Sequence, residues 1–234
     1  MSGRSDAAHT SKHYEQELRE LREKLILMGS LGEEMIGEGM KALATRDAAR
    51  ARATIDVDRR IDRLECEADQ LAMQILATRQ PVASDLRFLT ASLKIVTDLE
   101  RIGDLSVNIC ERVVELCDEP PLPVRIDLGG LAEEAVSALH EALDALVARD
   151  VAHATELLRR DDVIDDHYSA IFAEVLRVMG NDPTTIFRAT RVQSIAKYLE
   201  RIADHAMNIS EVVVFLVQGR DIRHRRRPDG DADR

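Results

Sequence analysis

Carboxylate side chains recur four residues apart in segments with helical periodicity. Residues four apart lie one above the other on a helix, so each pair points two carboxylates in the same direction. Ligand sets made only of oxygen atoms suit hard cations such as Mg²⁺, Mn²⁺ or iron rather than a thiolate-type zinc site. The four pairs are Asp58 with Asp62, Glu100 with Asp104, Asp161 with Asp165, and Glu200 with Asp204.

The surroundings of Glu100 make its pair unusual. Steps of three and four residues along 86–114 meet an apolar or small side chain at every position except Glu100, and Asp104 lies at the edge of this seam. A buried carboxylate must either be protonated or gain a positive partner. Segment 196–207 repeats the arrangement around Glu200, so the sequence predicts two cation sites.

Small residues stand beside both sets of acids. Gly103 precedes Asp104, and Ala203 precedes Asp204. We expect both to leave room next to the carboxylates. Because Ala203 adds a methyl group, we expect the second site to be tighter or differently occupied.

Ordinary salt bridges are the alternative explanation. The chain has 43 acidic residues, so any single pair with this spacing is weak evidence, and ion pairs also perturb buried carboxylates. The arginines that could neutralise the acids are Arg59, Arg60, Arg87, Arg101, Arg191 and Arg201.

Two histidines lie close to acidic residues but are weaker ligand candidates. His205 adjoins Asp204, whereas its counterpart in the first set is Leu105. Asp150 precedes His153 by three residues at an expected helix start, where a capping role is the better explanation. The sequence also has no phosphate-binding glycine loop, dinucleotide fingerprint or serine elbow, so no catalytic residue is predicted.

The chain contains an internal duplication. DLERIGDLSVNI at 98–109 and YLERIADHAMNI at 198–209 share seven of twelve positions at an offset of 100. LATRDAARA at 43–51 and LVARDVAHA at 146–154 share five of nine positions at an offset of 103. The offset of 103 also aligns Asp58 and Asp62 with Asp161 and Asp165, and the offset of 100 aligns Glu100 and Asp104 with Glu200 and Asp204. Because two diverged copies keep these pairs, cation binding is favoured over chance.

Helix signals divide each copy into three. Asp47 and Asp150 are expected N-caps, and the PPLP segment at 120–123 cannot continue a helix. Short loops force antiparallel neighbours, so the fold class is all-α: two tandem antiparallel three-helix bundles related by internal pseudo-symmetry. The six long helices are expected at 13–46, 48–78, 85–117, 128–149, 151–180 and 183–218; the repeats at 13–118 and 126–219; and polar tails at 1–12 and 220–234.

Composition supports this fold and limits the function. Aromatic residues make up 3% of the chain, and eleven glycines and six prolines are too few for a many-turned β-fold. A net charge of −11 argues against a general nucleic-acid binder. No apolar run is long enough to span a membrane, and no export signal is evident. Three cysteines without metal-ligand spacing suit a reducing compartment.

A basic cluster follows the last helix. We expect it to be a solvated tail, with contact to anionic lipid or an acidic partner as the alternative. Its members are Arg220, Arg223, Arg225, Arg226 and Arg227.

Three motifs resemble those of a known family. RQPVASDLRFL at 79–89, TDLERIGDLSVNI at 97–109 and YLERIADHAMNI at 198–209 closely resemble the PhoU family, the phosphate-specific transport system accessory proteins. The resemblance covers nearly all of 13–219. It implies two pseudo-symmetric three-helix bundles, often dimeric, with clusters of iron, zinc or other metals on paired Glu/Asp-x-x-x-Asp motifs. In this chain the four acid pairs given above match those motifs, so the resemblance implies that their eight carboxylates are the metal ligands.

The resemblance also implies a role. Members of the family repress the phosphate-starvation response when phosphate is plentiful, and they link the phosphate ABC transporter and its ATPase to a sensor histidine kinase. The resemblance therefore implies a non-enzymatic, metal-binding signalling adaptor that is cytoplasmic and peripheral to the membrane at most. Two alternatives stay open: a metal-dependent helical enzyme for hydrolysis or redox chemistry, which lacks a histidine ligand shared by both halves, and a structural bundle whose acids form salt bridges.

Overall fold

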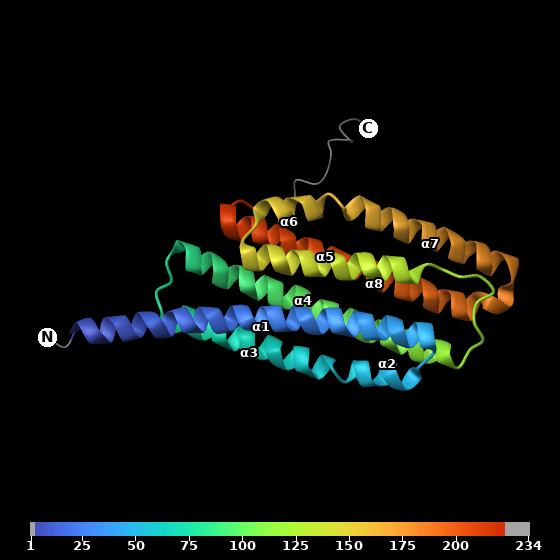
Figure 1. The fold of residues 1–234 in the computed structure, drawn as a ribbon, viewed down its shortest axis with the longest axis horizontal. Coiled ribbons are helices and arrows are strands. Elements are labelled where there is room, and N and C mark those ends of the chain that lie inside the picture. The colour runs from blue at the N-terminus through green and yellow to red at the C-terminus, as the bar shows by residue number, and fades with distance from the viewer. Residues whose placement is uncertain (1–2, 223–234) are drawn as a thin grey trace, which may run out of the picture.

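Every regular element that the structure describes is helical. The computed structural model describes residues 3–222, with side chains from residue 12 onward. The first repeat comprises α1 (Gly3–Thr45), α2 (Ala48–Ile55), α3 (Asp58–Thr78) and α4 (Ala83–Cys117). The second comprises α5 (Leu128–Ala148), α6 (Val151–Leu158), α7 (Asp161–Asn181), the 3₁₀ turn η1 (Pro183–Thr185) and α8 (Ile186–Gln218). The all-α prediction is confirmed, and the long helices lie side by side (Figure 1).

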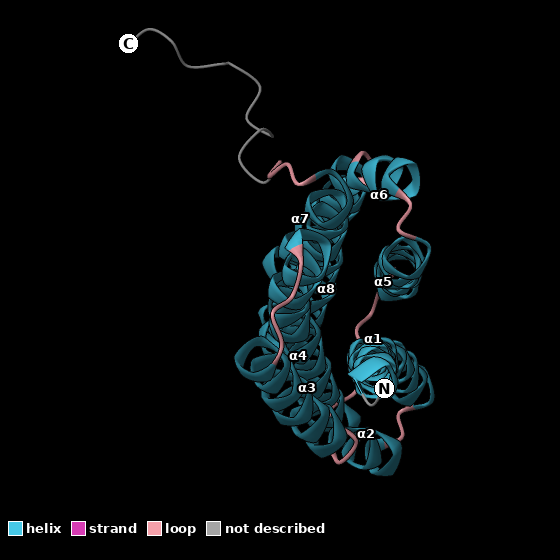
Figure 2. Ribbon diagram, turned by 90° about the vertical axis from the view of Figure 1, so that its left-hand side faces the viewer, coloured by secondary structure: helices cyan, strands magenta, loops and turns pink. Residues whose placement is uncertain are grey.

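The two repeats are joined mainly by the last long helix of each, α4 and α8. In the first repeat α4 packs against α1 and the α2–α3 segment, and in the second α8 packs against α5 and the α6–α7 segment. Contacts of α4 with α8 and of α1 with α5 connect the repeats. Viewed end-on, α3, α4, α8 and α7 form a curved row, with α1 and α5 on its inner side (Figure 2).

The apolar stripes of α4 and α8 form the centre of the core. Three pairs of equivalent residues in the two helices are each at most 1% exposed, in agreement with the duplication. Full burial of one such side chain contributes about 1.5–3 kcal/mol, so these positions contribute strongly to the core. They are Leu99, Ile102 and Ile109 in α4 and Leu199, Ile202 and Ile209 in α8.

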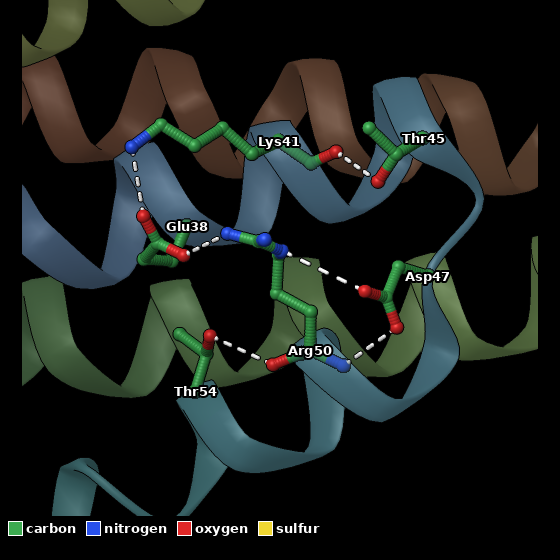
Figure 3. Close-up of polar contacts among 6 residues, drawn as sticks. All are labelled: Glu38, Lys41, Thr45, Asp47, Arg50 and Thr54. Carbon is green, nitrogen blue, oxygen red and sulfur yellow. Dashed lines mark hydrogen bonds and ion pairs between the residues drawn. The ribbon is translucent and has the colours of Figure 1, made fainter.

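The turn between α1 and α2 is fixed by charged side chains (Figure 3). Asp47 Oδ1 accepts a hydrogen bond from the Arg50 backbone N–H at 2.9 Å, which confirms the predicted N-cap. The Arg50 guanidinium reaches back to Glu38 Oε2 at 2.5 Å, and Lys41 Nζ donates to Glu38 Oε1 at 2.8 Å. The capping bond satisfies one of the free N–H groups at the start of α2.

The equivalent turn in the second repeat has the same backbone. Arg46 and Arg149 precede the two capping aspartates with φ of 55° and 52°. Asp150 Oδ1 accepts from the His153 N–H at 3.0 Å, so this residue is a cap, as expected. Left-handed backbone is costly for a residue with a side chain, and its occurrence at both positions shows that the duplication extends to backbone detail.

An arginine from each repeat holds the linker between them. The Arg46 guanidinium donates to the carbonyls of Leu116 and Cys117 at 2.8 and 3.0 Å, and also to that of Glu119. Arg188 donates to the carbonyls of Pro120 and Pro121 at 3.1 and 2.9 Å. The carbonyls at the end of α4 have no helical partner, so these arginines satisfy groups that the linker leaves open.

The structure departs from the expected element boundaries in three places. The second segment of each copy is present in two pieces, with turns at 56–57 and 159–160. Residues 3–12, expected as a tail, belong to α1. Of the basic tail, Arg220 is exposed after α8, and the arginines at 223 and 225–227 lie outside the described residues.

Candidate functional site

The first group of acids lies where α3 begins against the middle of α4. The turn at 56–57 makes Asp58 the first residue of α3, where a carboxylate interacts favourably with the helix dipole. Asp58 packs directly on Gly103: a Cβ there would lie 2.8 Å from Asp58 Oδ1 and 3.1 Å from Ile61 Cδ1. The small residue therefore leaves room for the carboxylate, as expected.

Negative charges from both helices converge on Asp58. Burial, followed by the charges of Asp62 and Asp104, raises the pKa of Asp58 to about 6. Burial and then the charge of Asp104 raise the pKa of Glu100, and the opposing effect of Arg101 is smaller. The structure thus brings the four predicted acids of this repeat into one electrostatic group that favours a positive partner.

Glu65 is a further member that the sequence analysis missed. Burial, then the charges of Asp69 and Asp62, raise its pKa, and Asp104 adds to the effect. Glu65 lies seven residues after Asp58 and three after Asp62, on the same face of α3. This spacing was the feature of the sequence that could have placed Glu65 in the first group.

The salt-bridge alternative is partly realised in this first group. Arg101 Nη1 lies 3.1 Å from Asp104 Oδ2, and its Nε lies 3.5 Å from Glu100 Oε2. Its side chain is 54% exposed, so solvent weakens both contacts. Other arginines considered from the sequence have different partners: Arg59 pairs with Asp56, Arg87 donates to the Leu216 carbonyl, and Arg191 pairs with Glu115.

The second group is more compact. Ligand atoms of Asp165, Glu200 and Asp204 all lie within 4.8 Å of one another. Partial desolvation, followed by the charges of Glu200, Asp161 and Asp165, raises the pKa of Asp204 to about 6. Asp161 begins α7, as Asp58 begins α3. The four predicted acids of this repeat also belong together.

Lys197 is the second residue that the sequence analysis missed. Its Nζ donates to Glu200 Oε1 at 2.7 Å and lies 2.6 Å from Glu200 Oε2. Partial burial is the largest single influence and opposes the charge of Lys197, but the hydrogen bond to Glu200 and the nearby negative charges together outweigh it and raise the lysine pKa. The Glu200 side chain is 11% exposed, so the carboxylate of this ion pair is largely shielded from solvent. The sequence could have revealed this ion pair, because Lys197 lies three residues before Glu200 on the same helix.

Burial of the acids differs from the expectation drawn from the apolar seam. Glu200 is buried, at 8% exposure. Glu100 and Asp104 are half-buried, whereas Asp165 and Asp204 are exposed. The seam prediction was therefore right for Glu200, and Glu100 is less buried than its place in the seam suggested, whereas the greater exposure of Asp104 and Asp204 fits their position at the edge of the seam.

His205 belongs to a different interaction. Its Nδ1 lies 2.9 Å from Asp98 Oδ1 on α4, and Asn208 Nδ2 donates to the same oxygen at 3.3 Å. This contact joins the two repeats. It agrees with the expectation that His205 is not a ligand shared by both sites.

Both acid groups fit a hard cation by the chemistry of their donors. All donors are carboxylate oxygens, which Mg²⁺, Mn²⁺ and iron accept. In the first group Gly103 lets the Asp58 carboxylate lie directly against α4, beside Asp104. In the second, both oxygens of the buried Glu200 already contact a positive group, the Lys197 ammonium. Asp58, Asp62, Glu100 and Asp104 would hold the first cation, and Asp161, Asp165, Glu200 and Asp204 the second.

Comparison with known proteins gives the family. The PhoU domain family matches residues 25–113 and 128–213, one range in each repeat. The chain belongs to the PhoU family. Among its relatives, the phosphate-specific transport system accessory protein PhoU homolog of Pseudomonas putida is 37% identical over 217 residues, which are 92% of this chain and 85% of the relative. The homolog of Caulobacter vibrioides (strain NA1000 / CB15N) is 37% identical over 219 residues, 93% of this chain and 95% of the relative.

Solved PhoU structures share the fold. PhoU from Pseudomonas aeruginosa superposes with a TM-score of 0.85 at 34% identity, covering 88% of this chain and 100% of the other. The phosphate transport system regulatory protein PhoU from Streptococcus pneumoniae gives 0.83 at 28% identity, covering 89% and 99%. Among the described residues, no helix has the length and apolar content needed to cross a membrane.

Proposed function

We propose that this chain is a non-enzymatic, cytoplasmic regulator of phosphate uptake that represses the phosphate-starvation response when phosphate is plentiful. The observation that carries the proposal is the match of both repeats to the PhoU domain, together with relatives named phosphate-specific transport system accessory proteins over more than 90% of the chain. The proposed partners are the ATPase of a phosphate ABC transporter and a sensor histidine kinase. A homodimer is part of the proposal.

Cations bound at the two acid groups would act as structural elements of this adaptor. A cation supplies positive charge to carboxylates that are partly desolvated and repel one another. Asp58 on α3 and Asp104 on α4 come from different helices and lie close enough to raise the pKa of Asp58. Sharing a cation would therefore fix α3 against α4, and the second group would do the same for α7 and α8. The result is a rigid helical surface for partners.

Gene deletion with complementation tests the regulatory role. In the deletion strain we expect a phosphate-starvation reporter to stay expressed in high phosphate, and the wild-type chain to restore repression. An Asp58→Asn/Asp104→Asn variant should restore repression poorly. Glu34 is an exposed acid on α1, away from both acid groups, so the control variant Glu34→Gln should restore repression fully. Normal repression in the deletion strain would contradict the regulatory role. Full complementation by the double variant would contradict only the cation part.

Contacts of Arg101 and Lys197 favour a second candidate, in which salt bridges alone hold the acids. Metal analysis of protein purified without chelator separates the two candidates. A turnover assay of metal-loaded protein on phosphoesters and peroxide tests the enzymatic alternative.

A further inference from the structure

Lys197 contacts both oxygens of the most buried acid in the second group. The distances from Nζ to Glu200 Oε1 and Oε2 are 2.7 and 2.6 Å. A metal ion bound by both oxygens of Glu200 would need the same space. The ammonium group therefore occupies the position of a cation on this carboxylate.

Two neighbours hold Lys197 in place. Its Nζ lies 5.1 Å from the ring centroid of Tyr168 on α7, within the range of a cation–π interaction. The Tyr168 hydroxyl accepts a hydrogen bond from Gln193 Nε2 at 2.8 Å, which orients the ring. Tyr168, Gln193 and Lys197 thus act together to keep a positive charge over Glu200.

The first repeat lacks this arrangement at all three positions. The offsets of 103 and 100 align Tyr168 with a glutamate, Gln193 with a leucine and Lys197 with a threonine. That glutamate is Glu65, which adds a carboxylate to the first group. The threonine is Thr97, whose hydroxyl donates to the Leu93 carbonyl at 3.2 Å. The first group thus has an additional carboxylate, Glu65, and the second has an ammonium group, Lys197, held beside Glu200.

We propose that Lys197 is a built-in competitor for metal at the second acid group. The group keeps its compact arrangement through the lysine, and a divalent cation must displace the ammonium from Glu200 to bind. The second site therefore binds metal more weakly than its own four carboxylates would allow. This inference rests on the cation part of the proposed function.

A Mn²⁺ titration of the chelator-stripped full chain, followed by the electron paramagnetic resonance signal of free Mn²⁺, tests the inference. The wild type should show two affinity classes, of which Asp204→Asn removes the weaker and Asp104→Asn the stronger. Lys197→Thr, which installs the residue of the first copy, should tighten the weaker class by on the order of tenfold, since a charge near the ligands is removed. The reciprocal Thr97→Lys should weaken the stronger class.

A matched control shows whether a change in Mn²⁺ affinity comes from removing the charge at the acid group or from losing any lysine. Lys94→Thr removes an exposed lysine that lies 5.3 Å from the Phe215 ring centroid, and it should leave both classes unchanged. Melting gives a second readout. Lys197→Thr should melt below the wild type with chelator present and level with it in saturating Mn²⁺, whereas a purely structural lysine would lower melting in both conditions.

The outcomes distinguish the two proposals. Two classes that Lys197→Thr leaves unaltered would overturn the role of Lys197 and leave the cation proposal standing. Absence of Mn²⁺ binding in the wild type and in every variant would overturn both.

Discussion

Asp58 and Gly103 contact each other across the α3–α4 interface, and a methyl group at Gly103 would lie 2.8 Å from Asp58 Oδ1. The second repeat has Ala203 at the equivalent position, where it is 1% exposed. The same backbone position thus carries a methyl group under one acid group and none under the other. At the first group the glycine lets the Asp58 carboxylate pack directly on α4.

Gly103→Ala should weaken the first acid group. The added methyl must displace Asp58 and Ile61, and overpacking costs about 1–3 kcal/mol. Alanine also favours helix over glycine by about 1 kcal/mol. The control is Gly37→Ala on α1, where a Cβ meets nothing within 4 Å and only the helix gain applies. Because the helix gain is common to both variants, urea unfolding should show Gly103→Ala to be less stable than Gly37→Ala by about 1–3 kcal/mol, and equal stability would refute the contact.

Chelation should lower the melting temperature. A cation that binds only the folded chain stabilises it by about 2.7 kcal/mol at a hundredfold excess over its Kd, which corresponds to roughly 5–10 °C here. Calorimetry with and without chelator measures the shift, and Mn²⁺, Mg²⁺ or iron should restore it. Glu100→Ala with Asp104→Ala should reduce the shift. A melting temperature indifferent to chelator and to this double substitution would remove the cation proposal.

The chelated protein should become more stable as the pH falls towards about 5. The pKa values of Asp58 and Asp204 are raised to about 6 in the folded chain. A raised pKa means that the folded state favours the protonated acid, so this contribution is complete below the ordinary pKa and is lost as the pH rises through about 6. Melting temperatures in chelator between about pH 5 and pH 7.5 check the sign. Asp58→Asn with Asp204→Asn should flatten the profile; a profile as steep as wild type would assign the effect to other groups.

The Asp98–His205 contact should couple the two repeats. Asp98→Ala leaves His205 and Asn208 without their shared acceptor and should cost about 1–2 kcal/mol. His205→Leu introduces the residue type found at the equivalent position of the first copy. In a double-mutant cycle by urea unfolding, the two changes should be non-additive by at least about 0.5 kcal/mol. Additive losses would show that the side chains act independently.

The helices themselves were predictable because their signals are local. Apolar spacing, the Asp47 and Asp150 caps and the proline-rich linker all act within a few residues. The duplication then predicted that both halves fold alike, and the structure has the same left-handed backbone at Arg46 and Arg149. The turns at 56–57 and 159–160 were missed, although aspartates at 58 and 161 also fit a helix start.

The acid rows were determined by sequence alone, since four-residue spacing fixes which side chains share a face of their own helix. Tertiary structure decided which neighbours join them: Glu65 at the first group, Lys197 at the second, and Asp98 for His205. It also decided that Glu200 is buried while Asp204 is exposed. The physical reason is that charge compensation and desolvation depend on the rotation and height of the adjacent helix, which are set by packing between segments far apart in the chain.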